Sequence, residues 1–433
     1  MNRKNGFILL TLLLLLAMSF GAAAQDDDVI EIDFYYPTAV GGPLSEIFDA
    51  YAADFNEQNP DIRVIPTYAG GYDDISAAVQ TEILGTGEGP VMAVMLSIDL
   101  QTFIDNGFIV PVQPFIDEMP EDEREAFVND FFPAFMENSV DEDGTIWSLP
   151  FQRSTPVLYY NKDMFEEVGL DPEHAPANRE EMVEFGQMLT NEDRWGLLIP
   201  SDGFPYWLFQ SFPIGNGLNV VGSSPSEVYL NAPEVVSALE FFISLADEHA
   251  IMPDGIIAWG DTPTDFTSGN AAMIYHTTGS LTNILRNADF EVGVGFLPAG
   301  DEGYGTPTGG GNIYIFSTAT PEEQAAAWRF AEYLTSPENQ AIWTIGTGYI
   351  ASRQSAWETE ELQELVEEFP QYGVARDQLE HAGKELATHQ GLDVRAIFNQ
   401  AISRAILGEM TPQEALDIAQ EEADAILSQY REE

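Results

Sequence analysis

FQRSTPVLYYNKDMFEEVGLDP, residues 151–172, is the stretch around which we expect the rest of the chain to be organised. It joins a polar run, 152–155, to a strand-like apolar run, 157–160, and then to a short amphipathic helix that ends at Gly169. Pro156 disfavours helical geometry at the residue before it, so the polar run is expected to be extended or turned. A polar segment that leads directly into a buried strand is either an ordinary loop or a segment whose side chains face a ligand.

Strand and helix patterns alternate along the first hundred residues. Strands are expected at 29–36, 62–68 and 91–96, and amphipathic helices at 44–57 and 75–84. This alternation predicts a mostly parallel sheet with helices on both faces, and such sheets bind ligands at the carboxyl ends of their strands. The later chain is expected to be largely helical, with an aromatic loop around 204–209, a strand at 290–296 and a glycine-rich loop at 304–312.

The composition excludes several classes of protein. The chain has 433 residues, with 16 Lys and Arg against 72 Asp and Glu, a formal charge of −56 that argues against nucleic acid or an anionic membrane as a partner. This acidity is typical of a halophilic protein and equally of a solubilising surface. The absence of cysteine excludes disulfides, thiol nucleophiles and a lipid-anchored cysteine. The five histidines lack metal-ligand spacing, so no metal, cofactor or catalytic residue is expected.

Residues 1–24 are expected to form a secretory signal peptide. Arg3 and Lys4 precede an apolar run at 7–20, and three alanines at 22–24 form a small-residue cleavage site. An uncleaved anchor is the alternative, but the apolar run is shorter than the roughly 20 residues that a spanning helix needs. The mature protein is expected to be secreted or periplasmic, without a cysteine anchor.

Several short motifs follow one another in a characteristic order: STPVLYYNKD (154–163), GLDP (169–172), GSLTNI (279–284), EVGVGFLP (291–298), GG (309–310), TGYI (347–350) and TPQEALD (411–417). Together they resemble the periplasmic solute-binding proteins of ABC importers, in the branch that binds glycerol-3-phosphate. The resemblance spans essentially the whole mature chain.

The resemblance implies a two-lobed α/β fold of the type II-like periplasmic-binding-protein class. Each lobe would be a mostly parallel sheet flanked by helices, with a ligand cleft between the lobes. The three interlobe crossings are expected near 150–155, 275–279 and 316–319. These divide the chain into an N-terminal lobe of residues 25–150 plus 279–317 and a C-terminal lobe of residues 151–278 plus 318–433.

The resemblance also implies a set of ligand-binding residues in that cleft: Tyr72, Ser154, Gly310, Tyr349 and Arg395, with Thr277 in place of a serine. Where the family has a glutamate at the end of the third strand, this chain has Ser97, with Asp99 two residues on. Arg153, Phe204, Tyr206 and Trp207 are further candidates for stacking on the ligand or lining the rim of the cleft.

The candidate side chains suit a phosphate ester. Arg395 offers a bidentate guanidinium fork, and the hydroxyl side chains offer hydrogen-bond donors. Each residue also has a structural alternative. Arg395 fits a surface ion pair, the tyrosines fit ordinary packing, the glycines fit a plain turn, and the aromatic residues fit the core. Arg153 fits a structural role as well as a second phosphate contact.

Three functions follow from these observations. The first is an exported, monomeric binding protein that captures glycerol-3-phosphate or a glycerophosphodiester and delivers it to the permease subunits of an ABC importer. The second is an oligosaccharide-binding protein of the same fold, which the aromatic residues, Asp99 and the missing glutamate favour. The third is a secreted hydrolase, for which the sequence carries no recognisable catalytic motif.

Overall fold

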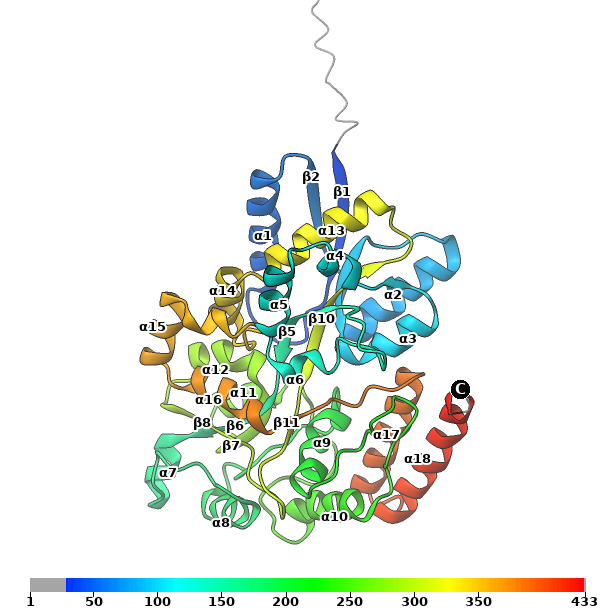
Figure 1. Ribbon diagram of the computed structural model, residues 1–433. Helices are drawn as coiled ribbons and strands as arrows, with labels where there is room; N and C mark the ends of the chain where they lie inside the picture. The colour runs from blue at the N-terminus through cyan, green and yellow to red at the C-terminus, as the bar shows by residue number, and fades with distance from the viewer. Residues whose placement is uncertain (1–28, 432–433) are drawn as a thin grey trace, which may run out of the picture.

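The computed structural model describes residues 29–431, which form two lobes stacked one above the other in Figure 1. The upper lobe in that view contains a six-stranded sheet of order β2-β1-β3-β10-β4, with β5 also paired to β10. Its strands are β1 (Ile30–Tyr36), β2 (Ile62–Tyr68), β3 (Met92–Leu96), β4 (Ile109–Val110), β5 (Leu149–Ser154) and β10 (Gly309–Phe316).

Helices cover the first sheet on both faces: α1 (Leu44–Gln58), α2 (Tyr72–Thr86), α3 (Leu100–Asp105), α4 (Gln113–Asp117), α5 (Glu121–Asn129), α6 (Pro133–Met136), α13 (Pro321–Leu334) and α14 (Pro337–Thr347). The apolar residues of α1 recur at helical spacing, and they include Phe48 and Phe55. The rings of Phe48 and Phe330 both meet Phe34 of β1 edge to face at 5.4 Å. Each such buried ring contributes roughly 1.5–3 kcal/mol of hydrophobic stabilisation.

The second lobe is built on a three-stranded sheet of order β7-β6-β8. Its strands are β6 (Pro156–Asn161), β7 (Met273–Thr277) and β8 (Val292–Gly295). The surrounding helices are α7 (Lys162–Val168), α8 (Arg179–Leu189), α9 (Pro205–Gly215), α10 (Pro233–Asp247), α11 (Thr262–Thr267), α12 (Leu281–Asn287), α15 (Glu360–Glu368), α16 (Gln371–Asp377), α17 (Gly391–Ile406) and α18 (Pro412–Leu427). A two-residue pairing of β9 (Thr306–Pro307) with β11 (Ala382–Gly383) lies near the junction of the lobes.

The two-lobed α/β architecture is confirmed, but the strand directions are more mixed than expected. β1 pairs in parallel with β2 and β3, as the early alternation of strand and helix predicts. β10 is antiparallel to β3, β4 and β5, and β6 is antiparallel to both β7 and β8. The parallel prediction failed beyond the first three strands because it extended a local pattern to strands that arrive from distant parts of the chain.

The lobe boundaries also differ from the expected ones. β8 pairs with β6, so residues 292–295 belong to the second lobe and not, as expected, to the first. α13 packs against β1 and β10, so residues 321–334 belong to the first lobe and not to the second. The crossings therefore lie at Thr155, between β9 and β10, and between α14 and α16. In both cases, apolar contacts with an existing sheet override the boundary inferred from polar runs.

Two segments that were expected to be loops form regular secondary structure, one a helix and the other a strand. The aromatic residues at 204–209 lie mostly in α9, which begins at Pro205, where a missing N–H costs nothing, and carries Pro213 in its last turn. Gly309, Gly310 and Gly311 are not in a loop, because they form the start of β10 and pair with β5.

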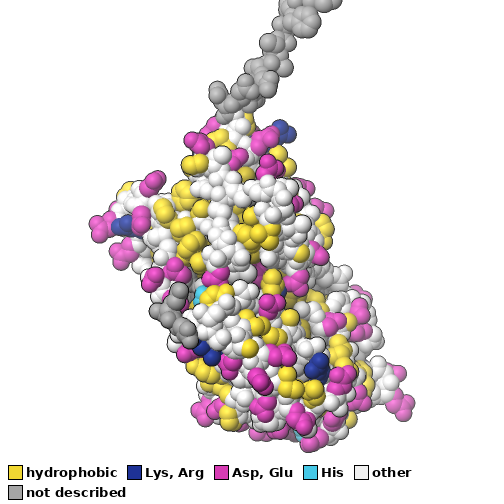
Figure 2. All heavy atoms as spheres, turned by 90° about the vertical axis from the view of Figure 1, so that its right-hand side faces the viewer, with side chains coloured by type: hydrophobic (Ala, Val, Ile, Leu, Met, Phe, Trp, Pro, Cys, Tyr) yellow, Lys and Arg dark blue, Asp and Glu magenta, His cyan; other side chains and the backbone are white. Residues whose placement is uncertain are grey.

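The surface is acidic: Figure 2 shows Asp and Glu side chains spread over both halves of the visible face, with few Lys or Arg side chains among them. Within residues 29–431, no helix has the length and apolar character needed to cross a membrane. The expected signal peptide, 1–24, lies outside the described residues.

The pairing of Gly310 with β5 leads to a first prediction. Gly310 has a φ of +93°, and a Cβ there would lie 2.0 Å from the carbonyl oxygen of Gln152. Gly107 has a φ of +67° with no atom within 4 Å of an added Cβ, so it isolates the conformational cost. We expect Gly107→Ala to lower the free energy of unfolding by roughly 1 kcal/mol and Gly310→Ala to lower it by a further 1–3 kcal/mol or so, measured by urea denaturation. An equal loss of free energy of unfolding in the two variants would show that β5 shifts to accommodate the added Cβ at no energetic cost.

Candidate ligand-binding site

A small cavity of about 30 Å³ lies between the two lobes. It is lined by residues from both sides of the junction: Ala39, Val40, Tyr72, Leu96, Ser154, Phe204, Tyr206, Trp207, Trp259, Thr277, Gly310, Tyr349 and Glu385. The lobes are in contact across it, because the indole N–H of Trp259 donates to the carbonyl of Ala39 at 3.2 Å. The structure therefore presents the cavity in a closed arrangement.

Hydroxyl groups from separate elements converge on this cavity. Tyr72 begins α2, Ser154 ends β5, Thr277 ends β7 and Tyr349 follows α14. The amide of Gln152 donates to the hydroxyl oxygens of Tyr72 at 2.7 Å and Tyr349 at 3.2 Å. Because each tyrosine oxygen acts here as an acceptor, its own proton can turn towards a ligand oxygen.

Aromatic rings form the second wall of the cavity. The rings of Phe204 and Trp259 meet edge to face at 5.0 Å, and the indole N–H of Trp207 donates to the carbonyl of Thr308 at 2.8 Å. Only a glycine fits at 309, since an added Cβ would lie 2.5 Å from the Trp207 ring. The ring of His276 packs against that of Trp259, with the ring centres 4.1 Å apart and the planes tilted by 32°. Burial lowers the pKa of His276 to about 4, so it supports the wall as a neutral ring.

Arg153 does not line the cavity. Its guanidinium donates to the carbonyl of Gly310 at 3.3 Å and to the side chain of Asn312 at 3.2 Å, and it lies over the ring of Phe135. Burial lowers its pKa, and the nearby carboxylate of Glu385 opposes that shift. Arg153 is thus a buried structural cation beneath the site rather than a group on the cleft rim.

Arg395 lies beside the cavity rather than in it. Its guanidinium contacts Asp73 at 2.9 Å and approaches Asp99 to 4.0 Å, and it borders an outer groove between α2 and α17. Asp99 is buried, and desolvation raises its pKa to about 6 although the charge of Arg395 opposes this rise. Ser97 and Asp99 form a 3₁₀ turn at the end of β3, behind the cavity wall.

Glu385 is the residue that sequence reasoning missed. It is 1% exposed, accepts from the hydroxyl of Tyr206 at 2.8 Å, and lies 3.4 Å from the hydroxyl of Ser97. The chain at this point is held from both lobes, by Asn138 through the Glu385 backbone and by Gln210 through the Leu386 N–H. In the sequence, it stands in an aperiodic segment beside Lys384, where a charged pair is typical of the surface, so no local signal marks it.

The structure brings most of the predicted site residues together. The cavity lining includes Tyr72, Ser154, Thr277, Gly310 and Tyr349, together with the aromatic candidates Phe204, Tyr206 and Trp207. Ser97, Asp99 and Arg395 lie in the adjoining layer, and Arg153 lies beneath it. Sequence reasoning also missed Ala39, Val40, Leu96 and Trp259. The roles of all these residues in ligand contact remain predictions.

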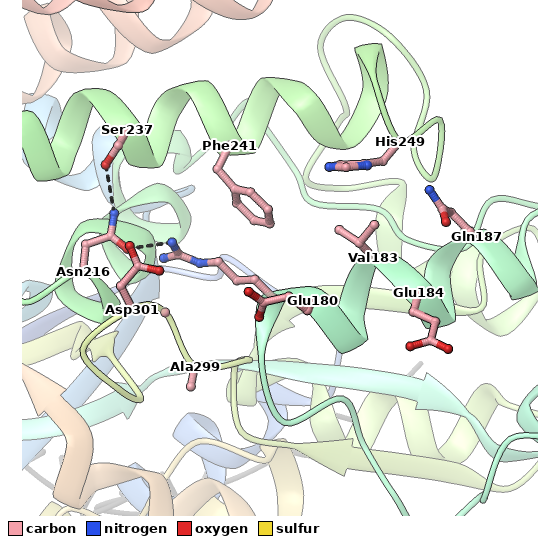
Figure 3. A pocket seen from close by; sticks show the side chains of 12 residues that line it. Glu180, Val183, Glu184, Gln187, Asn216, Ser237, Phe241, His249, Ala299 and Asp301 are labelled. Atoms are coloured by element: carbon pink, nitrogen blue, oxygen red, sulfur yellow. Dashed lines mark hydrogen bonds between the residues drawn. The ribbon is translucent and has the colours of Figure 1, made fainter.

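A larger groove elsewhere has a different character. Figure 3 shows it between α8 and α10 of the second lobe, bordered by Glu180, Phe241 and His249. Its cation, Arg179, is already engaged: it donates to Asn216 at 2.6 Å and to the carbonyl of Phe212 at 2.7 Å. This groove belongs to one lobe and its cation is already paired, so it lacks the convergent donors of the interlobe cavity. Over the described residues, no group of three His, Cys, Asp or Glu side chains is arranged to hold a metal.

The burial of Glu385 leads to a second prediction. Desolvation raises the pKa of Glu385 from 4.5 to about 7, although Arg153 opposes the shift. The folded protein therefore keeps this proton more tightly than the unfolded chain, and its stability falls as pH rises from about 4.5 to 7. We expect Glu385→Gln to match the wild type near pH 4 and to exceed its free energy of unfolding at pH 8, by on the order of 3 kcal/mol.

Urea denaturation at both pH values tests this expectation. Glu57→Gln, on the exposed side of α1, removes the same charge without burial and controls for the overall acidity. A wild type that is at least as stable as Glu385→Gln at pH 8 would contradict the argument.

Comparison with known proteins is consistent with this architecture. Residues 50–371, well over half of the chain, match the family described as bacterial extracellular solute-binding protein. The chain is 28% identical over 440 residues to the sn-glycerol-3-phosphate-binding periplasmic protein UgpB of Salmonella paratyphi A, and the alignment covers 96% of each protein. It is 27% identical over 435 residues to UgpB of Escherichia coli O6:K15:H31, with the same coverage.

Solved structures share the fold. UgpB from Mycobacterium tuberculosis in complex with glycerophosphocholine superposes with a TM-score of 0.81 at 22% identity, covering 92% of this chain and 99% of that one. Maltose-bound MalE3 of T. maritima superposes with a TM-score of 0.79 at 22% identity, covering 92% and 100%. From the family match over most of its length, we conclude that the chain belongs to the bacterial extracellular solute-binding proteins.

Proposed function

We propose that this protein captures glycerol-3-phosphate or a glycerophosphodiester between its lobes and delivers it to the permease subunits of an ABC importer. The observation that carries the proposal is the convergence of four hydroxyl side chains, those of Tyr72, Ser154, Thr277 and Tyr349, with the Gly310 backbone on one closed cavity. The named relatives that bind glycerol-3-phosphate support the same ligand class.

Hydroxyl donors are well suited to a phosphate ester. Hydrogen bonds to a charged group contribute roughly 1.5–3 kcal/mol each, so three or four of them suffice for a micromolar dissociation constant, about −8 kcal/mol. Arg395 adds positive potential from the neighbouring layer, where its Nη1 has no hydrogen-bond partner within the described chain. The distant acidic surface is screened beyond about 8–10 Å at ordinary ionic strength, so these local groups decide the affinity.

Contacts between the lobes give capture a physical mechanism. On one side of the cavity, Asp105 pairs with His389 at 2.8 Å and Asp73 pairs with Arg395 at 2.9 Å. Each pair joins a helix of the first lobe to the segment that leads into or forms α17. Separation of the lobes at the crossings would break these pairs and admit the ligand, and a bound ligand would favour the closed arrangement.

An oligosaccharide is the second candidate ligand. The aromatic wall of Phe204, Trp207 and Trp259 offers faces on which a sugar could stack, and a maltose-bound protein shares the fold. In the closed arrangement the cavity offers only about 30 Å³ of free space, so either ligand would require the lobes to separate before it could enter.

The proposal has further parts that rest on the sequence. The chain would be exported through a signal peptide at 1–24 and would remain free of a cysteine anchor. It would act as a monomer and as a binding protein without enzymatic turnover, metal or cofactor. The matched relatives are themselves named as binding proteins, which supports this assignment.

The hydroxyl cluster yields a third prediction. We expect Tyr349→Phe to weaken the binding of sn-glycerol-3-phosphate by about 10-fold to 100-fold, because it removes one donor to the phosphate. Isothermal titration calorimetry measures this directly. Tyr51→Phe is the matched control, since the Tyr51 hydroxyl is also buried but donates to the carbonyl of Asn339 within the first lobe.

Two results would contradict the proposed function. One is a wild type that binds maltose but not sn-glycerol-3-phosphate or glycerophosphocholine. The other is an equal loss of affinity in the Tyr349→Phe and Tyr51→Phe variants, which would assign the loss to general packing.

A further inference from the structure

The cavity carries a single carboxyl group among its described lining residues, that of Glu385. No lysine or arginine is among those residues, so the charge that faces the cavity directly is negative. A buried carboxylate at the wall of a site proposed for an anion needs a reason. Desolvation makes a buried carboxylate unfavourable, and a neutral residue at this position would avoid that cost.

The immediate partners of Glu385 leave it with spare acceptor capacity. An ionised carboxylate has two oxygens and about four lone-pair positions. The Tyr206 hydroxyl occupies one position on Oε1 at 2.8 Å, and the Ser97 hydroxyl approaches Oε2 at the long distance of 3.4 Å. At least two acceptor positions therefore remain on a carboxylate that lines the cavity.

The surroundings hold this carboxylate in place and balance its charge. Tyr206 comes from α9, Ser97 from the end of β3, and the backbone on either side is tied to Asn138 and Gln210. Arg153 on β5 and Arg395 on α17 favour the charged form of Glu385, whereas burial opposes it. In the closed arrangement the group is thus an acceptor whose orientation is fixed by contacts from both lobes.

We propose that Glu385 accepts hydrogen bonds from neighbouring hydroxyl groups of the ligand's polyol portion and thereby selects glycerol esters over other phosphate esters. This inference rests on the proposed function and deepens it. Phosphate would be repelled by the carboxylate and directed to the hydroxyl groups of Tyr72, Ser154 and Tyr349. The glycerol end would then face Glu385, so one charge fixes the orientation of the ligand and also the selectivity of the site.

The carboxylate also provides a means of rejection. A phosphate ester without hydroxyl groups would cover Glu385 and leave its free lone pairs buried without donors. Leaving buried polar groups unpaired is the most effective way for a site to discriminate against an analogue that lacks a hydroxyl. Ser97, at the end of β3, lies within 3.4 Å of the same carboxylate through its hydroxyl, so the first lobe also contacts this acceptor.

The test compares two phosphate monoesters that differ in their hydroxyl groups. Calorimetric titrations at pH 8 use sn-glycerol-3-phosphate and ethyl phosphate against the wild type, Glu385→Gln and the exposed control Glu57→Gln. We expect the wild type and the control to prefer sn-glycerol-3-phosphate strongly. Glu385→Gln should bind it about 10-fold to 100-fold more weakly while binding ethyl phosphate as well as or better than the wild type.

The outcomes separate the inference from the function on which it rests. If the wild type binds sn-glycerol-3-phosphate but Glu385→Gln loses affinity for both esters by the same factor, Glu385 is a packing residue and the inference is wrong. It is also wrong if the variant keeps the full preference for glycerol. If the wild type binds neither ester, the proposed function itself fails and this inference falls with it. Circular dichroism of each variant confirms that the comparison concerns folded protein.

Discussion

The antiparallel pairing of β5 with β10 is the interaction on which the rest of the site depends. It sets Ser154 opposite Gly309 and Arg153 opposite Gly310, one residue before the chain crosses into the second lobe at Thr155. Gly310 admits the β5 carbonyl and Gly309 admits the Trp207 ring, so neither position tolerates a side chain. A single register thus positions a hydroxyl, a backbone segment and an aromatic wall around one cavity, and it sends Arg153 to the opposite side of the strand.

The electrostatics of the cavity are set locally rather than by the strongly acidic chain. Arg153, Arg395, Asp99 and Glu385 are all at most 7% exposed, and each lies near a charge of opposite sign. At such burial, water cannot screen these charges, so their mutual arrangement outweighs the many acids on the surface. An anion can therefore be bound by a protein of formal charge −56, provided that its phosphate meets neutral donors and its hydroxyl groups meet the carboxylate.

Local patterns predicted the elements that local physics controls. The apolar spacing of α1 and the apolar run of β3 placed both within one or two residues of their ends. α9 was not predicted because four of the six residues at 204–209, around its start, are aromatic and show no helical period, and because the helix contains two prolines, Pro205 and Pro213. The lobe boundaries were not predicted correctly for a different reason. β8 packs against β6 and α13 packs against β1, strands more than a hundred residues away in the sequence, and no local signal encodes those contacts.

The residues of the candidate site differ in the same way: some lie in local sequence motifs, and others are placed only by long-range contacts. Residues such as Ser154 and Tyr349 stand in recognisable motifs, so the resemblance could place them, whereas Glu385 stands in a segment without motif or period. Its burial is decided by Asn138 in the first lobe and Gln210 in the second, which hold the backbone between them. A residue that is clamped from both lobes moves with neither alone, so its carboxylate is fully positioned only when the lobes close. The acceptor for the ligand's hydroxyl groups is therefore complete only after the lobes have closed. The protein would then discriminate between ligands when the lobes close around them rather than when they first bind.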